Sequence, residues 1–112
     1  MIVSGGVNIY PQEIERVIGA TPGVWDGAVV GVPDLRFGEQ PMAFVVPERS
    51  AAGDVPALVA AVRAACEREL GRFKWPVDVI ALERLPRTRT GKLVRRELRE
   101  HAVRHRPVSS LP

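Results

Sequence analysis

The sequence predicts an α+β fold in which helices flank a small central sheet of about three strands. Three segments have apolar residues at helical spacing, and short β-branched runs bounded by glycine and proline lie between them. The predicted elements follow one another as helix, strand, strand, helix, strand, helix. This order is typical of a compact α+β arrangement, and we expect residues 1–112 to form a single domain.

The N-terminal half contains one predicted helix and two predicted strands. The helix begins at Pro11, a residue favoured in a first turn, and is stopped by Gly19. The strands are predicted over residues 25–34 and 40–48, where β-branched residues are frequent. The turn-like stretch "DLRFGE" separates them, so we expect the two strands to pair.

The C-terminal half contains two further helices and a third strand. A long helix is predicted from an N-cap at Asp54 to Leu70, a strand within residues 77–86, and a terminal helix over residues 92–105. A frayed tail is expected over about 105–112. The inward-facing residues of the terminal helix are predicted to be Leu93, Val94 and Leu98.

Positive charge is concentrated at the C-terminal end of the chain. Residues 1–83 contain seven Lys or Arg and eleven Asp or Glu, whereas residues 84–112 contain nine and two. Such a field could attract nucleic acid, an anionic membrane surface or a phosphorylated small molecule. Residues 84–112 lack the aromatic side chains on which bases stack, which argues against a nucleic-acid-binding module.

Cysteine and histidine usage suggests neither a disulfide nor a metal site. Cys66 is the single cysteine, and its place on the apolar face of the long helix predicts a buried core thiol. His101 and His105 are four residues apart, but no carboxylate or thiol cluster completes a metal site. No secretory signal and no apolar run of roughly 20 residues is visible, so we expect a cytoplasmic protein.

Two glycine-containing motifs are candidates for function. In "SGGVNIYP", the adjacent Gly5 and Gly6 permit positive φ, either for a structural turn or for close approach of a ligand. "RTRTGKL" is not a nucleotide P-loop, because Pro86 and Leu93 stand where that motif requires Gly and Ser or Thr. It is instead predicted to be an exposed basic loop.

Lys92 is an unusual choice in this chain. The sequence contains fourteen arginines and only two lysines, Lys74 and Lys92, so a need for charge alone would most often be met by arginine. An ammonium group is a compact point charge on a flexible stem, whereas guanidinium is broad and planar. The lysine at position 92 therefore indicates a chemical need and not a need for charge alone.

Four motifs together resemble the C-terminal domain of the adenylate-forming acyl-CoA synthetase superfamily. They are "SGGVNIYPQEIE", "VVGVPDLRFGEQPMAFVVPE", "FKWP" and "LPRTRTGKLVRREL", in this order, within residues 2–100. The first and last are the most specific, and they are more similar to the CoA-ligase branch than to peptide-synthetase adenylation domains. The resemblance implies a fragment of a larger enzyme, with Met1 an internal residue after the interdomain hinge.

The resemblance implies a two-step reaction. A carboxylic acid and ATP form an acyl-adenylate and pyrophosphate, and the thiol of CoA then displaces AMP.

The domain is expected to be mobile and to present Lys92, beside Gly91, for adenylation. Ser4, Gly5 and Gly6 would border the pantetheine channel, and Lys74 would lie on the CoA side. ATP and CoA are implied as substrates, with Mg²⁺ held by a large N-terminal adenylation domain.

One segment departs from the family pattern. Several CoA ligases carry basic residues that meet the CoA nucleotide at the positions of Trp75 and Val77. Arg72 and Lys74 could replace those contacts, or the thiol acceptor could be a carrier-protein pantetheine. A free-standing partner or regulatory domain is the alternative to a domain of one large enzyme, and the acyl substrate cannot be inferred from these residues.

Overall fold

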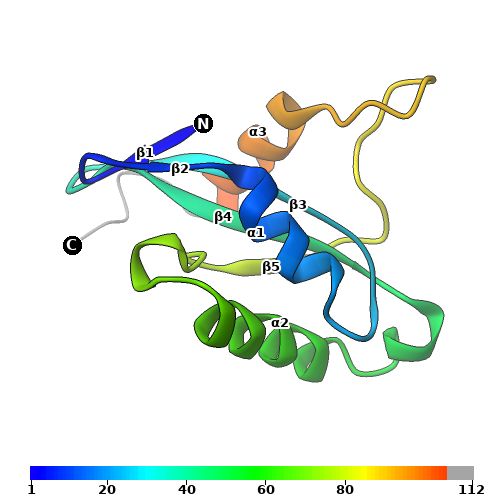
Figure 1. Ribbon diagram of the computed structural model, residues 1–112. Coiled ribbons are helices and arrows are strands. Elements are labelled where there is room, and N and C mark those ends of the chain that lie inside the picture. The colour runs from blue at the N-terminus through cyan, green and yellow to red at the C-terminus, as the bar shows by residue number, and fades with distance from the viewer. Residues whose placement is uncertain (106–112) are drawn as a thin grey trace.

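The computed structural model describes residues 1–105, in which a mixed sheet lies between helices on both of its faces (Figure 1). Helices α1 (Pro11–Gly19) and α2 (Val55–Glu69) pack on one face, and α3 (Arg95–His105) packs on the other. The α+β fold class predicted from the sequence is confirmed.

Within the described residues the sheet has five strands. They are β1 (Ile2–Ser4), β2 (Val7–Ile9), β3 (Val24–Asp34), β4 (Gly38–Pro47) and β5 (Val79–Ala81). The strand order is β2-β1-β4-β3, with all of these neighbours antiparallel, and β5 pairs in parallel with β4. The long β3–β4 hairpin is thus the scaffold to which the other elements attach.

Alternating side chains of this hairpin build two separate cores. On the face toward α1 and α2, the buried strand residues include Val29, Ala43 and Val45. On the face toward α3, they include Ala28, Val30, Val32, Met42 and Phe44. Because successive residues of a strand point to opposite faces, a continuous apolar run can serve both layers. Cys66 is buried in the first core, as predicted, and burial raises the pKa of its thiol.

The sheet has two more strands than the sequence predicts. β1 and β2 are each three residues long, which is too short for a period of two to be recognised in the sequence. β5 is also shorter than the predicted segment 77–86. The predicted N-cap of α2 is confirmed, because the Asp54 carboxylate accepts a hydrogen bond of 3.1 Å from the Ala57 amide.

The last helix begins three residues later than predicted, at Arg95 rather than Lys92. The residues before it pair back on the preceding chain instead, with Leu93 in an isolated antiparallel bridge to Arg87. Of the predicted inward-facing residues, only Leu98 belongs to α3, where it is buried. Leu93 packs partly buried against the same core. His105 still belongs to α3, and the rest of the predicted frayed tail, residues 106–112, lies outside the described residues.

The C-terminal end of α3 is tied to the opposite layer through Asp78. One carboxylate oxygen lies 2.9 Å from Nε2 of His105, and the other lies 2.7 Å from an Arg63 nitrogen on α2. Burial raises the pKa of Asp78, but hydrogen bonds from His105 and the Val79 amide, with the Arg63 charge, outweigh it and leave that pKa below its usual value. The ionised carboxylate is thus the form that joins these elements.

The first turn of α3 is joined to α1 by a second network. Arg95 donates to the Glu15 carboxylate at 2.9 Å and to the Val29 carbonyl at 2.7 Å. Glu15 in turn accepts from the Val29 amide at 2.9 Å. β3 is an edge strand, so these two side chains satisfy backbone groups that have no neighbouring strand.

Replacing Arg95 by alanine is expected to destabilise the fold by about 1–3 kcal/mol, because Glu15 and the Val29 carbonyl lose a charged donor. The measurement is the free energy of unfolding from urea denaturation. Arg96→Ala removes the same charge from the adjacent, exposed position of α3 and should cost less than about 0.5 kcal/mol. Equal losses for the two variants would contradict a specific role for this network.

Candidate functional site

Lys92 lies in a β-hairpin that projects from the body of the molecule between β5 and α3 (Figure 1). We call residues 86–94 the basic hairpin. Its two arms are joined by backbone hydrogen bonds from the Val94 amide to the Pro86 carbonyl, 2.9 Å, and from the Thr88 amide to the Lys92 carbonyl, 2.8 Å. The loop predicted over residues 87–91 is therefore an ordered turn.

Gly91 makes the tip of this hairpin possible. The Gly91 amide donates to the Thr88 carbonyl at 2.9 Å, and Gly91 has φ +89°. A three-residue hairpin loop with a left-handed glycine at its last position has this geometry. The Thr88 hydroxyl also accepts from the Lys92 amide at 3.1 Å. Gly91 thus fixes where the chain turns, and Lys92 follows as the first residue of the returning arm.

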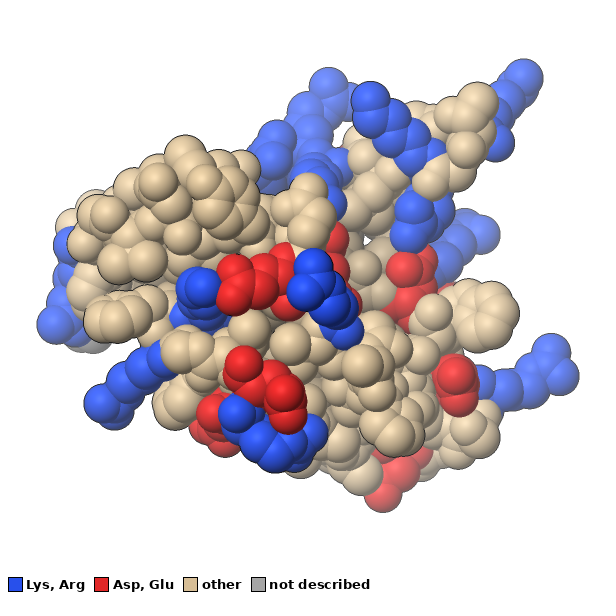
Figure 2. All heavy atoms as spheres, in the orientation of Figure 1, with Lys and Arg blue, Asp and Glu red and all other residues tan. Residues whose placement is uncertain are grey.

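The Lys92 side chain is exposed, and among residues 1–105 no ion pair or side-chain hydrogen bond involves its ammonium group. Blue side chains surround the basic hairpin and α3 in Figure 2, whereas the middle and lower parts of this face carry red side chains together with blue ones. The asymmetry of charge in the sequence is therefore an asymmetry in space. An anionic group from another domain or ligand could approach Lys92 without displacing any carboxylate of residues 1–105.

Ser4, Gly5 and Gly6 lie together at the β1–β2 turn. Ser4 pairs with Val7 across it, and the two glycines have φ of +57° and +83°. Two positive φ values are what a type I′ turn requires, so the glycines have a structural reason to be here. A Cβ on Gly5 would lie 3.3 Å from a ring carbon of Phe37, whereas a Cβ on Gly6 would meet nothing within 4 Å. Gly6 thus faces open space.

Lys74 lies in the short 3-10 helix η2 (Arg72–Lys74) and is paired within the domain. Its ammonium group donates to the Glu13 carboxylate of α1 at 2.7 Å. Trp75, which follows it, packs against the first core and donates its indole N–H to the Leu70 carbonyl at 3.0 Å. Val77 packs against the second core. Trp75 and Val77 therefore have structural roles, and neither offers a charge to a ligand.

The predicted site residues form two groups on different parts of the molecule. Figure 1 shows the β1–β2 turn at one end of the view and the tip of the basic hairpin at the other. Lys92 and Gly91 belong to the second group, and Ser4, Gly5 and Gly6 to the first. Lys74 is tied to α1, the helix that directly follows β2.

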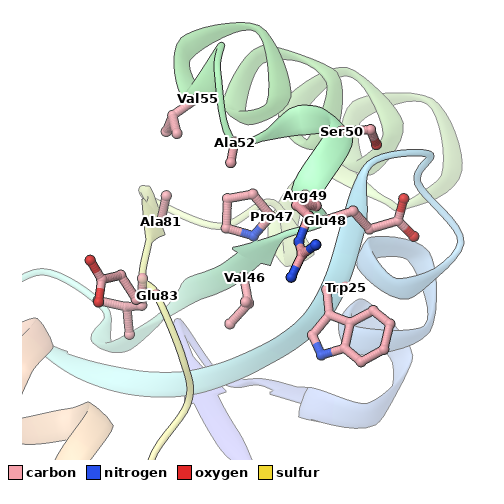
Figure 3. Close-up of a pocket in the computed structure, with 11 residues that line it drawn as sticks. Trp25, Val46, Pro47, Glu48, Arg49, Ser50, Ala52, Val55, Ala81 and Glu83 are labelled. Carbon is pink, nitrogen blue, oxygen red and sulfur yellow. The ribbon is translucent and has the colours of Figure 1, made fainter.

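A groove elsewhere on the surface contains none of these residues. It lies between the ends of β3 and β4, the start of α2 and the segment after β5 (Figure 3). Trp25, which is 76% exposed, borders it. The groove carries Glu48, Arg49 and Glu83 among mostly apolar neighbours. Neither group of candidate site residues forms part of its lining.

The described part of the chain has neither a cluster of metal ligands nor a membrane-spanning helix. No group of three or more His, Cys, Asp or Glu side chains in residues 1–105 is placed to hold a metal ion. No helix in that range is long and apolar enough to cross a membrane.

Two residues that the sequence did not single out take part in the contacts of the basic hairpin: Arg87, which belongs to it, and Asp26 of β3. One guanidinium nitrogen of Arg87 donates to the Gly91 carbonyl, and the other donates to the Asp26 carboxylate of β3, each at 2.8 Å. Arg87 could have been suspected from its place in the "LPRTRTGK" motif. Asp26 could not, because 61 residues separate it from Arg87 and no local pattern marks it.

The sequence matches the family model described as the AMP-binding enzyme C-terminal domain over residues 13–92. It is 42% identical over 100 residues to a 2-succinylbenzoate–CoA ligase of Listeria monocytogenes, covering 89% of this chain and 20% of that protein. It is also 42% identical over 100 residues to the long-chain-fatty-acid–CoA ligase FadD13 of Mycobacterium tuberculosis, covering 89% and 19%. The chain thus spans about one fifth of the length of these curated relatives.

Solved structures agree with this similarity. Apo MatB from Rhodopseudomonas palustris has a TM-score of 0.79 and 42% identity, with 88% of this chain and 19% of that chain covered. An acyl-CoA synthetase from Brucella canis has a TM-score of 0.82 and 32% identity, with 93% and 19% covered.

Proposed function

This chain belongs to the AMP-binding enzyme C-terminal domain family, and on that basis we propose that it is the mobile C-terminal domain of an ATP-dependent acyl-CoA synthetase. The reaction converts a carboxylic acid, ATP and CoA into acyl-CoA, AMP and pyrophosphate. The observation that carries this proposal is the unpaired Lys92 ammonium group, which a turn built around Gly91 presents away from the body.

Lys92 acts in the first half of this reaction. When an oxygen of the acid carboxylate attacks the α-phosphorus of ATP, the bond to pyrophosphate breaks and negative charge shifts on the oxygens involved. A cation placed against that charge in a site shielded from water stabilises the transition state more than the ground state. The ammonium group of Lys92 needs no proton transfer to do this, and it has no carboxylate partner to leave among residues 1–105.

The second half of the reaction uses the other group of residues. The thiol of the acceptor attacks the acyl carbonyl of the adenylate and AMP leaves. Gly5 and Gly6 border the path of the pantetheine, with Ser4 beside them, because a turn without side chains leaves room for a narrow arm. Between the two steps the domain rotates, so that first Lys92 and then the turn at Gly5 and Gly6 lies against the larger domain.

CoA is the proposed thiol acceptor. The named CoA ligases among the relatives support this choice. Lys74 is paired with Glu13, so it could meet the CoA phosphates only by sharing or leaving that carboxylate. Trp75 and Val77 pack in the cores and offer no charge to CoA. The contribution of this segment to CoA binding is therefore smaller than in ligases with basic residues at those positions, and a carrier-protein pantetheine remains the alternative acceptor.

The other partners follow from the same proposal. Residues 1–112 work as one domain beside a large N-terminal adenylation domain, in the cytoplasm, and that larger domain supplies the acid pocket and most ATP contacts. Residues 1–105 contain no group of three or more His, Cys, Asp or Glu side chains placed to hold a metal ion by themselves. Mg²⁺ bound with ATP is therefore assigned to the larger domain, and no step here depends on it.

The proposal is tested by comparing the isolated 112-residue chain with the full-length protein that contains it. We expect acid-dependent pyrophosphate release and thioester formation from the full-length protein alone, because the isolated chain forms only one wall of each site. Substantial pyrophosphate release by the isolated chain would contradict the assignment. Activity recovered by adding the isolated chain to a separate N-terminal part would instead support a free-standing partner domain.

A further inference from the structure

The basic hairpin is connected to the sheet by Leu93, which packs partly buried against the second core, and by one ion pair. Its backbone hydrogen bonds join one arm to the other, and the Thr88 hydroxyl contacts Thr90 and Lys92 within the same turn. These contacts fix the shape of the hairpin but not its direction. Among the hydrogen bonds and ion pairs of residues 1–105, the Arg87–Asp26 pair is the side-chain contact between the hairpin and β3.

Arg87 holds both ends of this connection at once. Its Nη1 donates to the carbonyl of Gly91, the residue directly before Lys92, and its Nη2 donates to Oδ2 of Asp26, each at 2.8 Å. The planar guanidinium fixes the two bonds relative to each other. The position of the peptide group between Gly91 and Lys92 is therefore coupled to the position of one carboxylate on the sheet.

Asp26 is itself held firmly. The pairing register of β3 with β4 shifts between Val24 and Asp26, an irregularity of the kind that redirects side chains at the end of a strand. Oδ1 of Asp26 accepts from the Gly27 amide at 2.9 Å, which leaves Oδ2 for Arg87. The carboxylate is thus oriented by the backbone of β3 before the hairpin contacts it.

We infer that Arg87 and Asp26 are positioning residues for Lys92: together they aim the basic hairpin so that the Lys92 ammonium group reaches the reacting oxygens during adenylation. This inference rests on the proposed role of Lys92. Arg87 acts through the Gly91 carbonyl and the direction of the hairpin, and needs no contact with substrate.

The pair should matter more for the rate than for folding. The Arg87 and Asp26 side chains are 39% and 30% exposed, and half-exposed ion pairs add little to the free energy of folding. A catalytic group displaced by about 1 Å, in contrast, can cost on the order of 10²-fold in rate. A large loss of rate with a small loss of stability is therefore the signature of positioning.

The test uses the full-length protein and measures pyrophosphate release from acid plus ATP. We expect Arg87→Ala to lower kcat about tenfold to a hundredfold with KM for ATP nearly unchanged. Thioester formation from supplied acyl-adenylate and CoA should keep its rate, and the urea unfolding midpoint should move little. Arg84→Ala is the matched control, because it removes the same charge from an exposed position outside the hairpin.

Asp26→Asn tests the other end of the connection. The amide oxygen of Asn can still accept from the Gly27 amide, but its amino group cannot accept from Arg87. We expect a loss of kcat similar to that of Arg87→Ala, and the double variant should be no slower than the worse single variant. Additive losses, or losses equal to that of Arg84→Ala, would overturn the inference.

Failure of this inference can be told apart from failure of the proposed function. If Lys92→Ala slows adenylation while Arg87→Ala and Asp26→Asn do not, the lysine acts as proposed but the ion pair does not aim it. If Lys92→Ala itself has no effect on adenylation, the proposed role of Lys92 is wrong. Hydrogen exchange of the Gly91 and Lys92 amides gives an independent readout, and both should exchange faster in Arg87→Ala.

Discussion

Replacing Lys92 by alanine in the full-length enzyme is expected to slow adenylation by roughly 10²–10³-fold, the usual cost of one electrostatic group that acts in the transition state. Thioester formation from supplied acyl-adenylate and CoA should keep its rate, since we propose that this step depends on the turn at Gly5 and Gly6 instead. The two half-reactions are assayed separately, by pyrophosphate release and by thioester formation. An equal loss in both halves would contradict the division of labour between the two groups.

Lys92→Arg is the informative companion variant, because it keeps the charge and the exposed position. The guanidinium cannot place its charge as a point between a carboxylate and a phosphate, so we expect it to recover only part of the adenylation rate. Full recovery would mean that any cation suffices at this position, and the choice of lysine in an arginine-rich chain would need another cause. Neither variant should alter folding, because the Lys92 side chain has no partner within residues 1–105.

The sequence predicted the main elements of the fold because their apolar patterns are long. The helix from Pro11 and the strands near residues 25–34 and 40–48 each match the structure within two residues. The apolar residues of these elements recur at the period of a strand or of a helix, and this pattern can be recognised without knowing which elements pack against them. The layer to which each belongs is not local information, and it follows from which face of the β3–β4 hairpin each helix covers.

The errors lie where a short segment gets its structure from distant partners. β1 and β2 are strands because they pair around a glycine turn and because Ser4 reaches Gly38 of β4. The start of α3 was misplaced because "KLVRREL" has a helical apolar pattern, yet Lys92 bonds back to Thr88 across the turn. In both cases a turn with a left-handed glycine and pairing across it outweigh the structure that the local sequence favours.

The candidate site could be predicted only in part for the same reason. Lys92 and Gly91 stand out in the sequence through composition and motif. The partners that orient them do not, since Asp26 lies far away along the chain and resembles any other acidic residue near a strand. Lys74 shows the converse, because a lysine near the expected CoA side is already paired with Glu13 of the same domain.

Replacing Gly6 by asparagine is expected to slow thioester formation at least about tenfold and to leave adenylation unchanged. Asparagine tolerates positive φ better than most residues, so the β1–β2 turn should persist. Its side chain would project into the open space in front of Gly6, where we place the pantetheine arm. A leucine at Gly5 would be a poorer test, because it would combine backbone strain with a contact against Phe37.

The control for backbone strain is Gly38→Asn, at the first residue of β4. Gly38 has φ +87°, close to the +83° of Gly6, and a Cβ there would make only an ordinary contact of 3.7 Å with the Val3 carbonyl. Both variants therefore carry a similar strain, but only Gly6→Asn adds bulk on the proposed thiol path. If the two slow thioester formation equally, the effect is strain and the turn does not border that path. If Gly6→Asn alone slows it and pyrophosphate release keeps its rate, thiol access at this end of the domain is separate from charge stabilisation by Lys92 at the other.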